Sequence, residues 1–141
     1  MGVSTDAIIA FGFDLGEELP ESMQGEDDED FDFDNWLADL LLPDLKEPQH
    51  GNYDTDWPEY WQLRSAAVDA FPVELIIHCS LDYPMYFLAA KGTDTLASRG
   101  NPKAISLPEV SPQAIAALKS FCDRHGVEWR EPSWHLFSMW G

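Results

Sequence analysis

The sequence predicts an α+β fold with a mainly antiparallel sheet of about four strands and three helices, in the order β-α-α-β-β-(β)-α-β. Strand-like apolar runs lie near both ends and in the middle of the chain. Segments with helical spacing lie between them, and a short turn separates the two central runs. Apolar residues make up 45% of the chain, which is enough to form a core.

One strand and a short helix are expected in the first part of the chain. Residues 7–13 form an apolar run that contains Gly12, and a turn-prone stretch follows. Asp34 or Asn35 then offers a helix cap. The short amphipathic helix that follows has apolar residues at helical spacing and a proline near its end: Trp36, Leu37, Leu40, Leu41 and Pro43.

A second helix is predicted after a loop that ends near residue 55. Asp56 is a suitable N-cap, and Pro58 lies close to the first helical position, where proline is tolerated. This helix is expected to place one broad apolar face against the core, formed by Tyr60, Trp61, Leu63, Ala67 and Val68.

The middle of the chain predicts a β-hairpin. Residues 72–80 and 85–91 are apolar runs, and the sequence LDYP between them is a turn candidate. A short further strand is expected at residues 104–107, within a turn-rich stretch.

The last third predicts a helix and a final strand. Ser111 is the expected cap, Pro112 occupies the first helical position, and Gly126 ends the helix. Its apolar stripe consists of Ile115, Leu118, Phe121 and Cys122. Residues 135–140 then alternate as the last strand.

Most of the charge lies in one segment. The formal net charge is −18, and residues 14–59 hold 17 acids and one base, whereas residues 60–141 hold 8 acids and 7 bases. We therefore expect a single domain over residues 1–141 with an acidic segment at about 14–59. A nucleic-acid-binding protein carries the opposite sign of charge, so direct binding to DNA or RNA is disfavoured.

The densest acidic stretch is GEDDEDFDFDNW, residues 25–36, in which aromatic side chains alternate with acids. Acids set the rate of association with a basic partner, and aromatics anchor an interface by packing. The candidate partner-binding residues are Glu26, Asp27, Asp28, Glu29, Asp30, Phe31, Asp32, Phe33, Asp34 and Trp36. In the alternative hypothesis, the aromatics hold the acidic segment against the protein's own core.

The motifs of common catalytic and metal sites are absent from the sequence. It contains no phosphate-binding glycine motif, no H-E-x-x-H and no C-x-x-C, so no cofactor and no metal site are predicted. The one local group of nucleophile type is His78, Cys79, Ser80 and Asp82. Neighbouring residues on a strand point to opposite faces, so His78 and Cys79 do not form a catalytic pair. The sequence thus favours a binding protein over an enzyme.

The remaining signals concern the compartment. Cys79 and Cys122 lie far apart in apolar surroundings, which is typical of reduced thiols in a cytoplasm. The first residues lack the basic region of a signal peptide, and no apolar run approaches the roughly 18 residues of a membrane span. No membrane association is expected.

Several segments resemble a group of small phage and prophage accessory proteins. The segments are STDAIIAFGFDLGEE, HCSLDYPMYFLAAK, ASRGNPKAI and PSWHLFSMWG. The resemblance covers most of the chain except residues 17–58, and it brings no known active site. It implies a phage protein that acts in the cytoplasm of a bacterial host. By analogy of class, small and very acidic phage proteins suggest inhibitors of host defence, of the anti-CRISPR or anti-restriction type.

Three functions are therefore expected as alternatives. In the first, the acidic segment mimics DNA and docks on the basic, nucleic-acid-binding groove of a host-defence protein. A duplex carries one charge per about 1.7 Å of axis, and an extended chain rises about 3.3 Å per residue, so the two charge densities are of the same order. In the second, the protein is an oligomeric structural or accessory phage protein with a solvated acidic loop. In the third, it is a small-molecule-binding protein or enzyme with an aromatic pocket.

Overall fold

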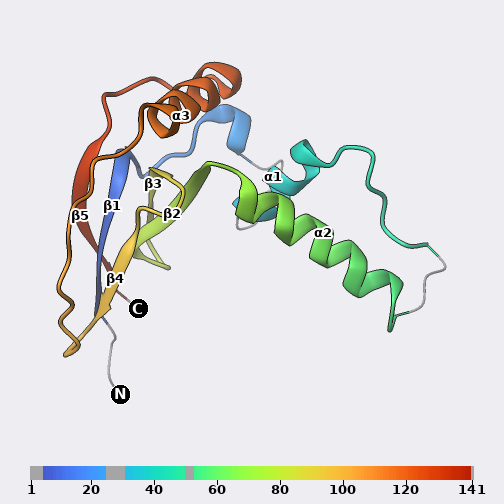
Figure 1. Ribbon diagram of the computed structural model, residues 1–141, viewed down its shortest axis with the longest axis horizontal. Coiled ribbons are helices and arrows are strands. Elements are labelled where there is room, and N and C mark those ends of the chain that lie inside the picture. The colour runs from blue at the N-terminus through green and yellow to red at the C-terminus, as the bar shows by residue number, and fades with distance from the viewer. Residues whose placement is uncertain (1–4, 25–30, 50–52, 141) are drawn as a thin grey trace. The chain divides into compact units, whose positions relative to one another are not determined.

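A computed structural model describes residues 5–24, 31–49 and 53–140 (Figure 1). Contacts within the chain divide it into two compact units. We call residues 1–24 and 72–141 the sheet unit, and residues 25–71 the helical unit. The second unit overlaps the predicted acidic segment but begins and ends later in the chain. The expectation of a single domain stays a prediction.

The described elements follow the predicted order and confirm an α+β fold. The sheet unit contains the strands β1 (Thr5–Gly16), β2 (Val73–Ser80), β3 (Pro84–Ala90), β4 (Thr95–Ser98) and β5 (Ser133–Trp140), the helix α3 (Pro112–His125) and a 3-10 turn (Glu21–Met23). The helical unit contains α1 (Phe33–Leu41) and α2 (Asp56–Ala70).

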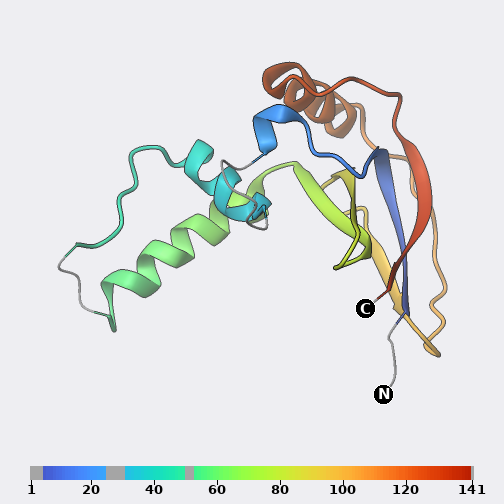
Figure 2. The same ribbon diagram turned by 180° about the vertical axis from the view of Figure 1, so that it is seen from behind.

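The strands of the sheet unit form a closed ring of pairings. Their order is β3-β2-β5-β1-β4, and β3 also pairs with β1, so β1, β3, β2 and β5 close on one another. All pairings are antiparallel except that of β2 with β5, where Cys79 is opposite Met139. Figure 2 shows β1 and β5 running side by side along their length. The sheet is therefore mixed but mostly antiparallel.

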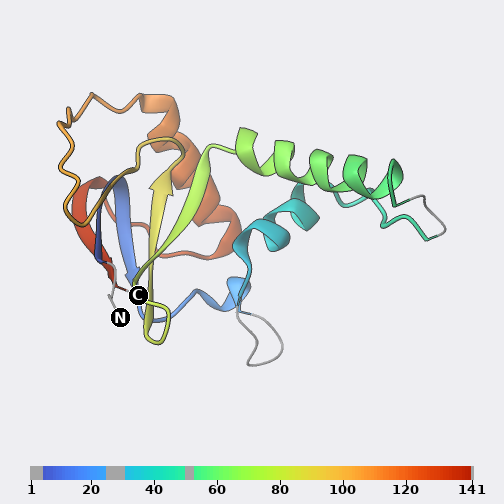
Figure 3. The ribbon, with the colours of Figure 1, turned by 90° about the horizontal axis from the view of Figure 1, so that it is seen from below.

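The strand predicted at 104–107 is wrong. Those residues are irregular and exposed, and β4 instead occupies residues 95–98. The reason lies in the edge of β1, whose residues 12–16 pair with β3 and whose residues 6–9 pair with β4. Gly92, with a φ of +80°, lets the chain turn between these two strands. Residues 95–98 therefore pair with the edge of β1, and residues 104–107, which come later in the chain, do not. Figure 3 shows the irregular segment between β4 and α3 looping outside the strands.

Small and aromatic residues share the interior of the ring. Ala10, Phe87 and Ala89 are buried together, and Ile76 and Phe137 pack against them. The Phe87 and Phe137 rings lie 4.7 Å apart between centroids. The alanines leave room for these rings, so the core depends on residue size as well as apolarity.

The local signals around α3 are confirmed. The Ser111 side chain accepts a hydrogen bond from the Ala114 N–H at 3.2 Å, and Pro112 opens the helix. Gly126 ends it in the left-handed conformation at a φ of +66°. Leu118, Phe121 and Cys122 are buried as the stripe predicts. α3 packs against β2 and β3.

Gly12 marks the closest approach between β1 and β3. A Cβ atom at this position would overlap the carbonyl oxygen of Leu88 and crowd the Cα of Ala89. Both obstacles belong to the backbone, which cannot rotate away as a side chain does. The ring can therefore close here only with glycine.

We predict that Gly12→Ala lowers the free energy of unfolding by about 3 kcal/mol, because overpacking against backbone forces the strands apart. Chemical denaturation followed by far-UV circular dichroism measures the change. Ser138→Ala, at an exposed position on β5, is the matched control and should change stability by less than about 0.5 kcal/mol. Equal stability of the Gly12 variant and the parent would contradict the close approach.

Glu74 is a carboxyl group set into the sheet unit. Burial, and next the neighbouring Asp94, raise the pKa of Glu74 from 4.5 to about 7, although Lys91 opposes the shift. The Lys91 Nζ lies 3.8 Å from Glu74 Oε2, and Glu74 Oε1 is buried without a hydrogen-bond partner among the described residues. The folded protein thus binds a proton here more tightly than the unfolded chain does.

This raised pKa predicts a loss of stability as pH rises from about 4.5 through 7, where the folded state holds more protons than the unfolded state. Glu74→Gln should match the parent near pH 5 and be more stable at pH 8, by up to about 3 kcal/mol. Thermal unfolding at both pH values measures the difference. Glu109→Gln, at an exposed position, is the control for lost charge. An equal effect of the two variants at pH 8 would contradict the role of burial.

Candidate functional site

The proposed acidic site is only partly described by the structure. Glu26, Asp27, Asp28, Glu29 and Asp30 lie outside the described residues. Phe31, Asp32, Phe33, Asp34 and Trp36 are described and belong to the start of α1. The geometry of the site is therefore argued from α1 and from α2, which packs against it.

Asp32 caps α1, which corrects the expected cap at Asp34 or Asn35. The backbone N–H of Asn35 donates to Asp32 Oδ1 at 3.2 Å, and the Asn35 side chain donates to Asp32 Oδ2 at 3.0 Å. An aspartate at this position satisfies a free N–H and is favoured by the helix dipole. The sequence has several aspartates near this point, so only the structure shows which of them caps the helix.

The aromatic residues of the acidic stretch differ in exposure. Phe33 is buried at 8% exposure, and its ring lies 5.7 Å from that of Trp36. Phe31 lies 6.1 Å from Trp36, and both are half-buried. The burial of Phe33 agrees with the alternative hypothesis, in which the aromatics hold the acidic segment against the protein's own core, and its role in partner binding stays a prediction. Asp34 is exposed, and Phe31 and Trp36 remain partly accessible.

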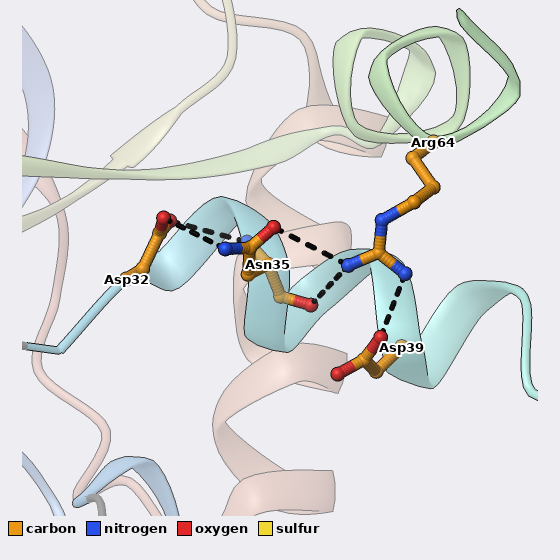
Figure 4. Close-up of polar contacts among 4 residues, drawn as sticks. All are labelled: Asp32, Asn35, Asp39 and Arg64. Carbon is orange, nitrogen blue, oxygen red and sulfur yellow. Dashed lines mark hydrogen bonds and ion pairs between the residues drawn. The ribbon is translucent and has the colours of Figure 1, made fainter. Parts of the chain in front are cut away.

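A buried arginine joins α1 to α2 (Figure 4). Arg64 is 7% exposed, and its Nη1 lies 2.7 Å from Asp39 Oδ1. Its Nη2 donates to the Asn35 backbone carbonyl at 3.2 Å and to Asn35 Oδ1 at 3.3 Å. The chain of contacts thus runs from Asp32 through Asn35 to Arg64, and from there to Asp39. It links the helix cap to the packing of the two helices.

Aromatic rings complete the surroundings of this guanidinium. Its central carbon lies 5.4 Å from the Tyr60 ring centroid and 5.8 Å from that of Trp61. The hydrogen bond that Arg64 donates to Asp39 is the largest cause that raises the pKa of Arg64, and burial opposes this shift. Its Nε is buried without a hydrogen-bond partner in the described part of the chain. Arg64 is therefore held as a permanent cation inside an acidic unit.

The face predicted for the second helix is partly wrong. Tyr60 and Val68 are buried, but Trp61 and Leu63 are exposed, and Arg64 takes the central buried position. Thr55 is the N-cap residue of α2 in place of Asp56. The sequence signal for Arg64 was the spacing Tyr60, Arg64, Val68, which places the three residues on one helical face. Burial of a charged residue in that stripe could be predicted only if its carboxylate partner on α1 were known.

The rings at the start of α2 form a stack. Tyr53 and Trp57 lie 6.3 Å apart with an interplanar angle of 15°, and Trp57 and Trp61 lie 6.4 Å apart at 27°. Tyr53 is 83% exposed and Trp61 is 49% exposed. Trp57 and Trp61 are four residues apart on one side of α2, and Tyr53, which precedes the helix, stacks on Trp57.

The described acids of the helical unit all face solvent. Each of them is exposed: Asp32, Asp34, Asp39, Asp44, Glu47, Asp54, Asp56, Glu59 and Asp69. The unit as a whole holds 14 acids and two bases, Lys46 and Arg64. One of these bases is buried, so the surface field is strongly negative.

Two members of the nucleophile-type group in the sheet unit, His78 and Ser80, make structural hydrogen bonds. His78 is buried, and its Nε2 lies 2.9 Å from Asp14 Oδ1 on β1, a partner 64 residues away that sequence reasoning missed. Cys79 is exposed at the strand end with a φ of 71°, and the Ser80 hydroxyl accepts from the Tyr83 N–H at 3.0 Å. His78 is thus buried where Cys79 is exposed, as expected for neighbours on a strand.

Neither the buried cysteine nor the pocket of the helical unit has the character of a reactive or ligand-binding site. Burial raises the pKa of Cys122 to about 11, which disfavours its reactive thiolate. The pocket between α1 and α2, lined by residues such as Asp34, Trp61 and Asp69, has a volume of about 110 Å³. Ligand pockets commonly measure about 300–1,000 Å³. Across the described ranges, no three His, Cys, Asp or Glu side chains are placed to hold a metal ion.

Comparison of the chain with protein-family models, curated proteins and solved structures gave no match. The function is therefore argued from the site alone. No helix in the described part of the chain has the length and apolar character that crossing a membrane requires.

We predict that Arg64→Lys destabilises the helical unit by about 2 kcal/mol, because an ammonium group cannot contact Asn35 and Asp39 as the planar guanidinium does. Asp39→Asn should lose less than about 1 kcal/mol, since that side chain is 72% exposed. Hydrogen exchange of α1 and α2 amides measures both effects. Arg99→Lys, an exposed change in the sheet unit, is the control. Unchanged exchange in the Arg64 variant would contradict its role as the link.

Proposed function

We propose that this protein is a phage-encoded, non-enzymatic inhibitor that binds a basic, nucleic-acid-binding surface of a host-defence protein in the bacterial cytoplasm. The observation that carries the proposal is the separation of charge in the helical unit. Its described acids are all exposed, while the cation Arg64 is buried and paired with Asp39. A surface of this kind repels nucleic acid and attracts proteins that bind it.

The acidic surface is supported by elements that hold it in a fixed form. Asp32 and Asp39 are tied to Asn35 and Arg64, so the acids of α1 project from a helix whose packing is fixed. A preorganised charged surface loses less entropy on binding than a flexible acidic tail. This supports specific docking over general solvation of the unit.

We predict that converting Asp27, Asp28, Glu29 and Asp30 to amides weakens partner binding strongly at low salt. The difference from the parent should shrink near 1 M salt, where the screening length is about 3 Å. Stability should rise or stay level, because repulsion between like charges falls. Pull-downs from a bacterial lysate at both salt concentrations, followed by identification of the bound proteins, measure this effect.

The matched control removes the same number of charges from the sheet unit, by amide substitution of the exposed residues Asp82, Glu109, Glu128 and Glu131. It should leave binding nearly unchanged. A short DNA duplex should release the captured protein from the parent. If the first variant binds and inhibits as well as the parent at physiological salt, the acidic stretch is only a solvated segment.

One observation favours the alternative of an oligomeric accessory protein. The sheet unit exposes large apolar side chains: Leu81, Tyr83, Leu96, Ile105, Leu107, Leu136 and Trp140. A pocket of about 160 Å³, lined partly by Ile9, Ile105 and Leu136, lies among some of them. Exposed apolar patches commonly mark interaction surfaces.

For this alternative, we predict that Leu136→Lys converts any oligomer of the parent to monomer, because Leu136 is 75% exposed and a charge there cannot be buried in an interface. Light scattering coupled to gel filtration measures the mass. Ser120→Lys, which adds the same charge at an exposed position on α3, is the control and should leave the oligomer intact. A parent that is monomeric at all concentrations would remove this alternative.

A further inference from the structure

The aromatic stack of α2 has a definite chemical character beyond its exposure. We use the name stack face for Tyr53, Trp57 and Trp61. Adjacent rings lie 6.3 and 6.4 Å apart and tilt by 15° and 27°, so the stack face is a ladder of nearly parallel rings. Rings with exposed faces offer a negative quadrupole to a planar cation.

The same aromatic group already holds one guanidinium. Arg64 lies over the rings of Tyr60 and Trp61 at 5.4 and 5.8 Å. Tyr60 and Trp61 themselves are in contact, with centroids 5.0 Å apart. Trp61 therefore belongs both to the buried arginine site and to the stack face. The geometry for stacking an arginine on these rings is present within the protein itself.

Charge selects the class of partner. Exposed carboxylates lie beside the stack face in the chain: Asp54, Asp56 and Glu59. Exposed rings alone would also stack with nucleic-acid bases, but acids at this spacing repel the phosphate backbone. A partner that combines positive charge with a planar group satisfies both the rings and the acids.

We propose that the stack face, together with its neighbouring acids, docks arginine side chains of a basic protein segment. This deepens the proposed function, on which it rests for the kind of partner, and it assigns docking to residues outside the stretch 25–36. Arginine is favoured over lysine because a guanidinium is planar, weakly hydrated and able to stack, whereas an ammonium group is a compact, strongly hydrated charge.

The test compares two labelled peptides of equal length and charge, oligo-arginine and oligo-lysine, by fluorescence anisotropy with the full chain. The parent should bind oligo-arginine about tenfold more tightly, as expected for two exposed cation–π contacts. Tyr53→Ser and Trp61→Gln should each bring the arginine-to-lysine ratio of affinities towards one. Glu59→Gln should weaken both peptides by similar factors and leave the ratio in place.

Leu63→Ser is the matched control, because Leu63 is exposed on the same helix but outside the stack face. It should leave the ratio unchanged. Trp61 also contacts Arg64, so the Trp61 variant can disturb folding. In that case the Tyr53→Ser variant tests the proposal, because Tyr53 precedes the helix and is largely exposed. Circular dichroism checks that each variant is folded.

Three results would overturn the proposal. The first is a ratio of affinities near one in the parent, and the second is a ratio that is unchanged in the Tyr53 variant. The third is tighter binding of an oligothymidine than of oligo-arginine, which would identify the stack face as a base-stacking surface. Failure of the proposed function can be distinguished from failure of this inference. The proposed function is tested by the release of a captured protein by duplex DNA, and that result does not depend on the ratio of peptide affinities.

Discussion

The helical unit depends on one buried guanidinium. Its 14 acids and two bases give a chain segment that repels itself, yet α1 and α2 pack together. Arg64 opposes this repulsion at the contact itself, through Asp39 and the two oxygens of Asn35. Burying a charge is unfavourable unless hydrogen bonds and an opposite charge compensate for it. Most of those bonds are made here, and the rings of Tyr60 and Trp61 add to them.

The sheet unit is stabilised in a different way. A ring of pairings encloses alanines and aromatic rings, and Gly12 allows two strands to approach closely. The buried His78 pairs there with Asp14 on β1. Packing therefore fixes the sheet unit, whereas a charged network fixes the helical unit. This difference implies that salt acts mainly on the helical unit, whereas the pH dependence of stability comes from Glu74 in the sheet unit.

Elements with local signals were predictable from the sequence. Ser111, Pro112 and Gly126 define α3 by their own backbone preferences, and the hairpin of β2 and β3 needs only a turn between two apolar runs. Features that depend on distant partners were missed. β4 is selected by the free edge of β1, and the burial of Arg64 by a carboxylate 25 residues away. Within the site, the abundance of acids was predictable, but their exposure and the choice of Asp32 as cap required the fold.

In the proposed function, the acids and the aromatic rings of the helical unit serve different stages of recognition. Carboxylates act over roughly a Debye length, which is about 8 Å at physiological salt, so they steer a basic partner before contact. Rings act only at contact, and their stacking is far less sensitive to salt. A surface with acids alone would bind any basic protein weakly, and a surface with rings alone would bind bases as readily as arginines. Under the proposed function, the described acids and the ladder of Tyr53, Trp57 and Trp61 together favour a partner that is both basic and able to stack. Arginine-rich nucleic-acid-binding surfaces have both properties.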